Sequence, residues 1–212
     1  MELCIGATRL ASREHLDHAA EAALIDRCRR QDMDAFGKLV DAYQNRVFGF
    51  VRRMVPNVEE ASDVTQEVFI RAFQSFGRFD ARSSVRTWLF RIAYNLCIDR
   101  ARKVDRSITE VGMSLAQDTE EQIDVADNRW QPEKVALDLE LQEAIEEGIR
   151  TMSEKLRTVL ILHDREDTPY EEIARIVGTP IGTVKSRLFL ARAHLQNVLK
   201  NYLHSEVTSN EK

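Results

Sequence analysis

The chain has 212 residues, of which 43% are hydrophobic and 31% are charged, so it can bury a core and remain soluble. Its cysteines, Cys4, Cys28 and Cys97, are too scattered for a disulfide framework or a zinc site. The N-terminus carries acidic residues, unlike a signal peptide, and no apolar run approaches the ~20 residues of a membrane span. We therefore expect a cytoplasmic protein that needs no metal or other cofactor.

Apolar residues recur at spacings of three and four along most of the chain, and strand signals are weak. This pattern predicts an all-α fold. We expect two small helical domains joined by a flexible acidic linker. Residues 1–21 would form an N-terminal extension and residues 205–212 a tail.

The first domain is expected over residues 22–103. An apolar stripe at helical spacing runs from Ala35 to Met54, Pro56 ends that helix, and Asn57 or a neighbour can cap the next one. The next helix shows a polar face with one apolar residue, made by Asp63, Gln66, Glu67, Ile70 and Arg71. Such a face suits a partner helix, and it equally suits ordinary exposure to solvent.

The segment Phe79–Arg100 combines arginines with aromatic residues. Ser83 or Ser84 is placed to cap a helix whose buried stripe includes Trp88, so we interpret Trp88 as a core residue. Off that stripe lie Arg82, Arg86, Tyr94, Arg100, Arg102 and Lys103. Arginine meets phosphates while rings stack on unpaired bases, so this segment suits single-stranded DNA.

Charge is segregated along the chain, whose net charge is −5. Residues 71–106 hold nine basic and three acidic residues, a net charge of +6, and residues 175–212 hold six basic and two acidic residues, a net charge of +4. Between them, residues 107–147 hold two basic and twelve acidic residues, a net charge of −10. Basic blocks on helices are candidate phosphate-binding surfaces. Residues 104–131 lack a sustained apolar period, which predicts the linker.

The second domain is expected over residues 132–204. Ser153 is placed to cap one helix. In Thr168-Pro169-Tyr170-Glu171, Thr168 can cap a short helix, and Gly178 ends that helix. Another helix opens at Pro180, so the pair predicts a helix-turn-helix.

The second helix of such a pair enters the DNA major groove and presents its N-terminal half to the bases. No Asp or Glu occurs from Arg175 to Lys200, which fits a surface lying against phosphates. The residues expected to face DNA are Thr183, Lys185, Ser186 and Arg187, with Arg192 further along.

Together these motifs resemble the extracytoplasmic-function (ECF) sigma factors, the smallest members of the main bacterial sigma superfamily. The resemblance covers roughly Leu24 to Leu203. Its motifs are Asp34-Ala35-Phe36, Asp63-Val64-Thr65-Gln66-Glu67-Val68-Phe69, Arg86-Thr87-Trp88-Leu89 with Asn95 and Ile98-Asp99, Tyr170-Glu171-Glu172-Ile173-Ala174, and Gly182-Thr183-Val184-Lys185-Ser186-Arg187. Each motif alone is weak, but all of them in this order are specific.

The resemblance implies a stress-response subunit that joins core RNA polymerase, through its β′ and β subunits, and directs it to promoter DNA. Residues 22–103 would be sigma region 2 and residues 132–204 sigma region 4. The implied polymerase-binding residues are Asp63, Gln66, Glu67, Ile70 and Arg71. The implied −10 element residues are Phe79, Arg82, Ser83, Arg86, Tyr94, Asn95 and Arg100. The implied −35 element residues are Thr183, Lys185, Ser186, Arg187 and Arg192.

The resemblance also implies that the acidic linker threads polymerase channels. An anti-sigma factor, often membrane-anchored in this family, would hold the chain inactive. From the residues themselves, we expect the free chain to bind duplex promoter DNA poorly, because a flexible linker leaves the spacing of the two basic blocks undefined.

Two other classes of protein compete with this interpretation. An ordinary helix-turn-helix transcription regulator is compatible with the second domain, but it needs neither the Asp63–Phe69 motif nor the Arg86–Asp99 motif. A nucleic-acid enzyme would need a carboxylate–metal cluster, an activated nucleophile or a phosphate-binding glycine loop, and the sequence offers none. We therefore expect no catalytic residue and no small-molecule substrate.

Overall fold

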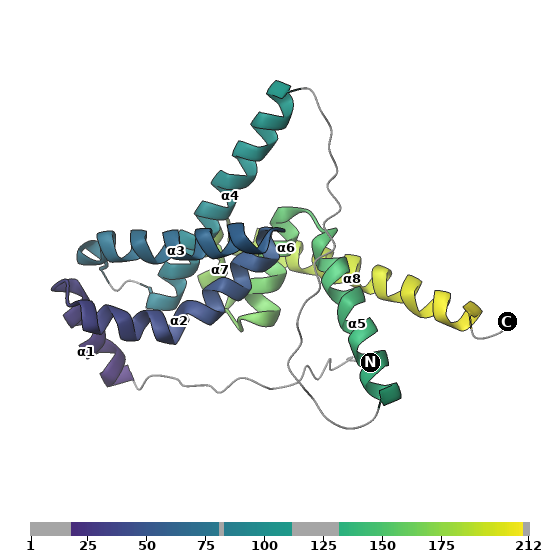
Figure 1. Ribbon diagram of the computed structural model, residues 1–212, viewed down its shortest axis with the longest axis horizontal. Coiled ribbons are helices and arrows are strands. Elements are labelled where there is room, and N and C mark those ends of the chain that lie inside the picture. Colours follow the sequence, from purple (N-terminus) through teal and green to yellow (C-terminus); the bar gives the residue numbers. More distant parts are fainter. Residues whose placement is uncertain (1–17, 81–82, 112–131, 210–212) are drawn as a thin grey trace.

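The computed structural model describes residues 18–80, 83–111 and 132–209, and its regular elements there are all helices (Figure 1). The first domain comprises α1 (His18–Arg29), α2 (Met33–Met54), α3 (Val58–Ser75), a 3-10 turn (Phe76–Arg78) and α4 (Val85–Val111). The second comprises α5 (Pro132–Arg150), α6 (Glu154–Leu160), a π-helical turn (Ile161–Arg165), α7 (Tyr170–Val177) and α8 (Ile181–Ser209). The all-α prediction is confirmed for these residues. No described helix is both long and apolar enough to span a bilayer.

Local hydrogen bonds fix where the helices of the first domain begin. The Asp32 carboxylate caps α2 by accepting from the Ala35 N–H at 3.0 Å. The Asn57 side chain caps α3 by accepting from the Glu60 N–H at 3.0 Å, as the sequence indicated. Of the two serines before α4, Ser84 is the one that caps, because its Oγ accepts from the Thr87 N–H at 3.1 Å.

The core of the first domain is built largely from aromatic rings. Phe50 on α2 and Phe90 on α4 are fully buried and meet edge to face at 5.4 Å between ring centroids. Phe76 packs edge to face on Trp88 at 5.2 Å. The interpretation of Trp88 as a core residue is therefore confirmed. Such edge-to-face pairs add to the stability gained from burial alone, so α2 and α4 are held firmly together.

Two thiols are enclosed in this domain, and we expect neither to react in the native chain. Cys28 and Cys97 are 1% and 4% exposed, and burial raises the pKa of Cys28 and takes that of Cys97 to about 12. Few thiolates therefore exist at pH 8, and the thiolate is the reactive species. In a Cys4→Ser chain, a chromogenic disulfide reagent at pH 8 should release no colour until denaturant is added. Rapid reaction of one thiol without denaturant would contradict this burial.

Two glycines shape the second domain. A Cβ on Gly148 of α5 would lie 2.8 Å from Leu195 and 3.3 Å from Val198, so only glycine permits this close approach of α5 to α8. Gly178 has φ +66°, a left-handed conformation that ends α7 and turns the chain into α8. Ile173 and Val184 pack in the core beneath that turn. The predicted helix-turn-helix is therefore present in the structure.

Two predicted caps in this domain differ from the structure. Thr168 does not cap α7: the cap position is held by Pro169, and the Thr168 hydroxyl instead donates to the Glu166 carbonyl at 3.5 Å. Thr168 is 2% exposed, and a buried backbone carbonyl needs a hydrogen-bond donor. The Thr168 hydroxyl therefore pairs within its own turn and does not cap the helix. Ser153 occupies the cap position of α6, but its side chain makes no capping hydrogen bond.

The helices extend past the domain boundaries expected from sequence. α4 continues to Val111 rather than ending near Lys103, and α8 continues to Ser209. The C-terminal halves of both helices project from the body of the molecule (Figure 1). A helix outside the core needs no apolar stripe, and that stripe was the signal used to place the boundaries. The rest of the expected acidic linker, residues 112–131, lies outside the described residues.

The two domains contact each other directly. α4 packs against α7, and α2 packs against α6 and the π-helical turn. In Figure 1, α7 lies beside the first domain, between the ends of α2 and α4. The expectation that nothing fixes the spacing of the two domains is therefore wrong for this structure, because their spacing is set by side-chain contacts.

Candidate nucleic-acid and polymerase interfaces

The outer face of α3 carries the residues predicted to bind polymerase. Asp63, Gln66, Ile70 and Arg71 are exposed and Glu67 is half-buried, so all five lie together on one side of the helix. Ile70 is 50% exposed, although most large apolar residues of the domain are buried. Glu67 pairs with Arg71 one turn later at 2.6 Å. An apolar residue surrounded by charges is typical of the centre of a protein-binding surface.

A cleft of about 510 Å³ lies between this face and α4. Its walls include Asp63, Glu67 and Arg71 from α3 and also Asp99, Arg102 and Lys103 from α4. Asp99 and the two basic residues were not predicted from sequence to lie at this face. Arg102 and Lys103 could have been recognised from sequence as exposed basic residues, because they continue the basic run off the buried stripe of α4. Their nearness to α3 depends on how the two helices cross.

The residues predicted to bind the −10 element differ in how accessible they are. Asn95 is exposed, whereas Ser83, Arg86, Tyr94 and Arg100 are half-buried. Phe79 is 5% exposed, with its ring 5.1 Å from that of Trp88 and its carbonyl accepting from Arg29, so its side chain belongs to the core. Arg82 lies outside the described residues.

Arg100 forms an ion pair within the first domain. Its guanidinium lies 2.8 Å from the Glu60 carboxylate and links α4 to α3. The hydrogen bond from Arg100 lowers the pKa of Glu60, and the same bond raises the pKa of Arg100. Arg100 therefore helps to hold α3 and α4 together in addition to any contact with DNA.

The residues predicted to bind the −35 element lie on the N-terminal half of α8. Lys185 and Ser186 are exposed, and Thr183 and Arg187 are half-buried. The Lys185 ammonium lies 5.5 Å from the ring centroid of Tyr170 on α7, a cation–π contact that orients it. The first turn of α8 contains no acidic residue. Thr183, Ser186 and Arg187 are three and four residues apart and so share one side of α8, whereas Lys185 lies on the side that faces Tyr170 of α7.

Arg192 differs from the other four residues because it is already paired. Its guanidinium contacts both carboxylate oxygens of Asp164, at 2.5 and 3.2 Å. This ion pair neutralises the charge of Arg192 and links α8 to the π-helical turn. Among the residues that the structure describes, no group of three or more His, Cys, Asp or Glu side chains is arranged to hold a metal ion.

Comparison with known proteins identifies both domains. The profile of Sigma-70 region 2 matches residues 39–107, and the profile of Sigma-70, region 4 matches residues 142–195. A helical chain that carries these two regions in order is a sigma-type transcription initiation factor, a class that acts by binding and is not an enzyme.

Similarity to individual proteins indicates which kind of sigma factor this chain is. The chain is 37% identical to the ECF RNA polymerase sigma factor SigW of Bacillus subtilis, over 84% of this chain and 95% of that protein. It is 32% identical to the ECF RNA polymerase sigma-E factor of Escherichia coli, over 85% of this chain and 95% of that protein. The chain therefore belongs to the ECF sigma factors of the sigma-70 family, and it directs transcription initiation by RNA polymerase at promoter DNA.

Two solved structures share this fold. One is the sigma factor RpoE in complex with the anti-sigma factor NepR from Bartonella quintana, with a TM-score of 0.64 and 25% identity, covering 78% of this chain and 96% of that one. The other is CnrH in complex with the cytosolic domain of CnrY, with a TM-score of 0.63 and 22% identity, covering 85% and 97%.

Proposed function

We propose that this sigma factor binds core polymerase through the α3 face and reads the −35 element through the N-terminal half of α8. The observation that carries the proposal is that the predicted contact residues on both helices reach the surface, with Ile70 at 50% exposure on α3 and Lys185 and Ser186 exposed on α8. The α3 face is mixed in charge around an apolar centre, which suits a protein, whereas α8 offers basic and hydroxyl groups, which suit DNA.

The −10 element would be read by the first part of α4 and the segment before it. Arg86, Tyr94 and Asn95 supply a cation, a ring and an amide along one helix, the groups that bind phosphates and unpaired bases. The acidic linker between the two domains would be drawn into a basic polymerase channel. The chain would act in the cytoplasm, where polymerase and promoters are found.

We also infer an anti-sigma partner for this chain. The support is that RpoE and CnrH, which share its fold across both domains, were solved in complex with NepR and with the cytosolic domain of CnrY. Such a partner would bind the surfaces that polymerase needs, and a membrane anchor on it, common in the family, would keep the complex at the membrane until a stress signal arrives.

The test is run-off transcription with purified core polymerase on a panel of promoter variants. The wild-type chain should initiate only at particular promoters. Arg187→Ala or Lys185→Ala should lose about 1–3 kcal/mol of binding and relax the preference at one −35 position, because each would remove a contact to a base edge.

Arg175→Ala is the matched control, since Arg175 is exposed on α7 and its loss removes the same charge outside the base-reading positions. It should weaken all promoters alike, if it weakens any. If the Arg187→Ala and Lys185→Ala variants match the wild-type chain at every promoter, the assignment of α8 to the −35 element is overturned.

A further inference from the structure

A histidine lies beside the α8 surface that is proposed to meet DNA. His163 belongs to the π-helical turn, and its ring stacks on that of Tyr170 of α7, with 4.8 Å between ring centroids and 26° between the planes. The same Tyr170 ring holds Lys185, a predicted −35 contact, at 5.5 Å from its centroid. The imidazole is therefore one side chain away from a residue proposed to bind DNA.

One carboxylate is shared between this histidine and an arginine of α8. Asp164 Oδ1 lies 2.7 Å from Nδ1 of His163 and 2.5 Å from the Arg192 guanidinium, and we call Asp164 the shared carboxylate. Arg192 follows Lys185 by about two helical turns, so both cations lie on the same side of α8. Arg192 is thus a predicted −35 contact whose charge is engaged by the shared carboxylate.

The ring nitrogen that contacts the shared carboxylate also contacts the arginine. Nη2 of Arg192 lies 3.3 Å from Nδ1 of His163. Nδ1 can donate to Asp164 only when it carries a proton, and it can accept from Arg192 only when it carries none. A neutral ring with a bare Nδ1 therefore suits the pair between Arg192 and Asp164. The protonated ring has an N–H at both nitrogens, so it binds the shared carboxylate and repels the guanidinium.

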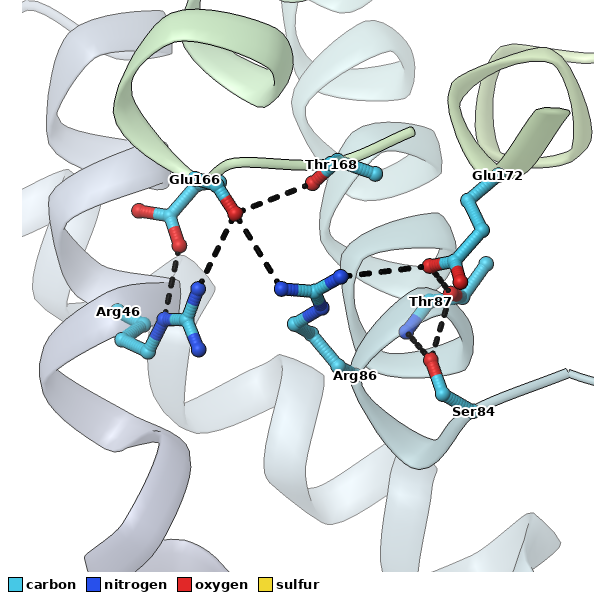
Figure 2. A network of polar contacts seen from close by, with 7 residues as sticks. All are labelled: Arg46, Ser84, Arg86, Thr87, Glu166, Thr168 and Glu172. Carbon is cyan, nitrogen blue, oxygen red and sulfur yellow. Dashed lines mark hydrogen bonds and ion pairs between the residues drawn. The ribbon is translucent and has the colours of Figure 1, made fainter. Parts of the chain in front are cut away.

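The other charged groups on the turn and on α7 near it are engaged elsewhere. Glu166 ends the turn and accepts from Arg46 of α2 at 2.9 Å, and Glu172 of α7 binds the start of α4 (Figure 2). Arg165 of the turn lies 3.1 Å from Glu146 of α5. The acid that faces the imidazole is therefore the shared carboxylate, and the cations that face it belong to α8.

Protonation of His163 would change how the shared carboxylate is paired. Imidazole is the side chain whose charge changes between pH 5 and 8, and this one is 26% exposed, so protons can reach it from solvent. The protonated ring would gain a charge-assisted hydrogen bond to Asp164, and Arg192 would be free to bind a DNA phosphate. Because the charges of Asp164 and Arg192 cancel, the net charge of the three groups would rise from zero to +1. DNA affinity should therefore rise as the pH falls.

We propose that His163 is a positioning residue for the −35 contacts and makes promoter binding stronger as the pH falls. Its protonated ring holds the shared carboxylate and releases Arg192 to a DNA phosphate. This inference rests on the proposed function, because α8 must lie in the −35 element for Arg192 to reach the DNA backbone. It adds one pH-dependent phosphate contact to the base contacts proposed for α8.

The test compares the affinity of holoenzyme for one promoter fragment at about pH 8 and about pH 6. Holoenzyme is core polymerase joined to the full-length chain or to a variant, so any pH response of the core enzyme is common to all samples. His163→Asn keeps a side chain that forms hydrogen bonds but cannot gain a charge. The affinity gain at the lower pH should be about fivefold larger for the wild-type chain than for this variant, the scale of one exposed ion pair.

Three further variants identify the groups that act. His163→Arg is charged at both pH values, so it should bind tightly at both and show the small response of His163→Asn. Arg192→Ala should lose most of the response, because no guanidinium remains to be released. His194→Asn is the matched control, since it makes the same change at a half-buried histidine of α8 that contacts Thr151 instead of the shared carboxylate. It should keep the full wild-type response.

A salt titration gives a second measurement. For the wild-type holoenzyme, the slope of log affinity against log salt should be steeper by about one at the lower pH, as expected for one added phosphate contact. Equal pH responses of the wild-type and His163→Asn holoenzymes would overturn the inference, and so would a full response in Arg192→Ala. Failure of the proposed function is separate, because it would appear at constant pH as an unchanged promoter preference of Arg187→Ala.

Discussion

The Phe50→Ala variant is expected to lose about 3–5 kcal/mol of the free energy of unfolding of the first domain. Phe50 is fully buried on α2, and its ring meets Phe90 of α4 edge to face at 5.4 Å. Truncation would leave a cavity between two helices that are held by their rings, and the cavity could not collapse without moving α2. Urea denaturation followed by far-ultraviolet circular dichroism measures the loss.

Phe189→Ala is the control for this variant, because it makes the same chemical change at a side chain that is 73% exposed on α8. Its unfolding free energy should stay within about 0.5 kcal/mol of the wild-type value. Equal losses in the two variants would mean that burial of Phe50 does not stabilise the domain.

Reversing two charges on α3, Asp63→Lys with Glu67→Lys, is expected to weaken binding to core polymerase by about 2–5 kcal/mol. Both residues lie off the buried stripe of α3, so the helix should remain folded. Within the helix, only the pair between Glu67 and Arg71 at 2.6 Å is lost, which is worth about 0.3–0.5 kcal/mol. A pull-down with purified core enzyme, together with circular dichroism, separates the loss of binding from any loss of structure.

A matched double reversal, Asp34→Lys with Asp41→Lys, changes the net charge equally at two exposed residues of α2, outside the α3 face. It should leave polymerase binding within about threefold of wild type, since distant surface charges act weakly through salt. If both doubles lose binding alike, the effect is one of overall charge, and the α3 face is not the docking surface.

Several features of the fold could be predicted because their causes lie within a few residues of sequence. The Asn57 cap depends on an N–H three residues away, and the end of α7 depends on the single left-handed Gly178. The apolar stripes of α2 and α3 follow from helical spacing alone. The Thr168 cap was predicted from an equally local signal but is absent, because burial in the interdomain turn gave its hydroxyl another acceptor.

The candidate site was predicted in part. The α3 face is contiguous on one helix, and Thr183, Ser186 and Arg187 share one side of α8, so these residues could be grouped from sequence. Phe79 could not be assigned this way, because an aromatic residue beside arginines suits either a stacked base or a core, and only its 5% exposure places it in the core here. Arg192 was likewise grouped by charge, whereas its pairing with Asp164 depends on how α8 packs.

By itself, the sequence determined the helical class, the two regions, their order and the family, since each follows from spacing, caps and motifs read along one helix at a time. Only the tertiary structure decided how the two domains meet. Arg46 and Glu166 are separated by 120 positions in the chain, and no local pattern relates them. A contact between residues so distant depends on the packing of every helix between them. The contact between the two domains and the partial burial of Arg86 therefore became evident only in three dimensions.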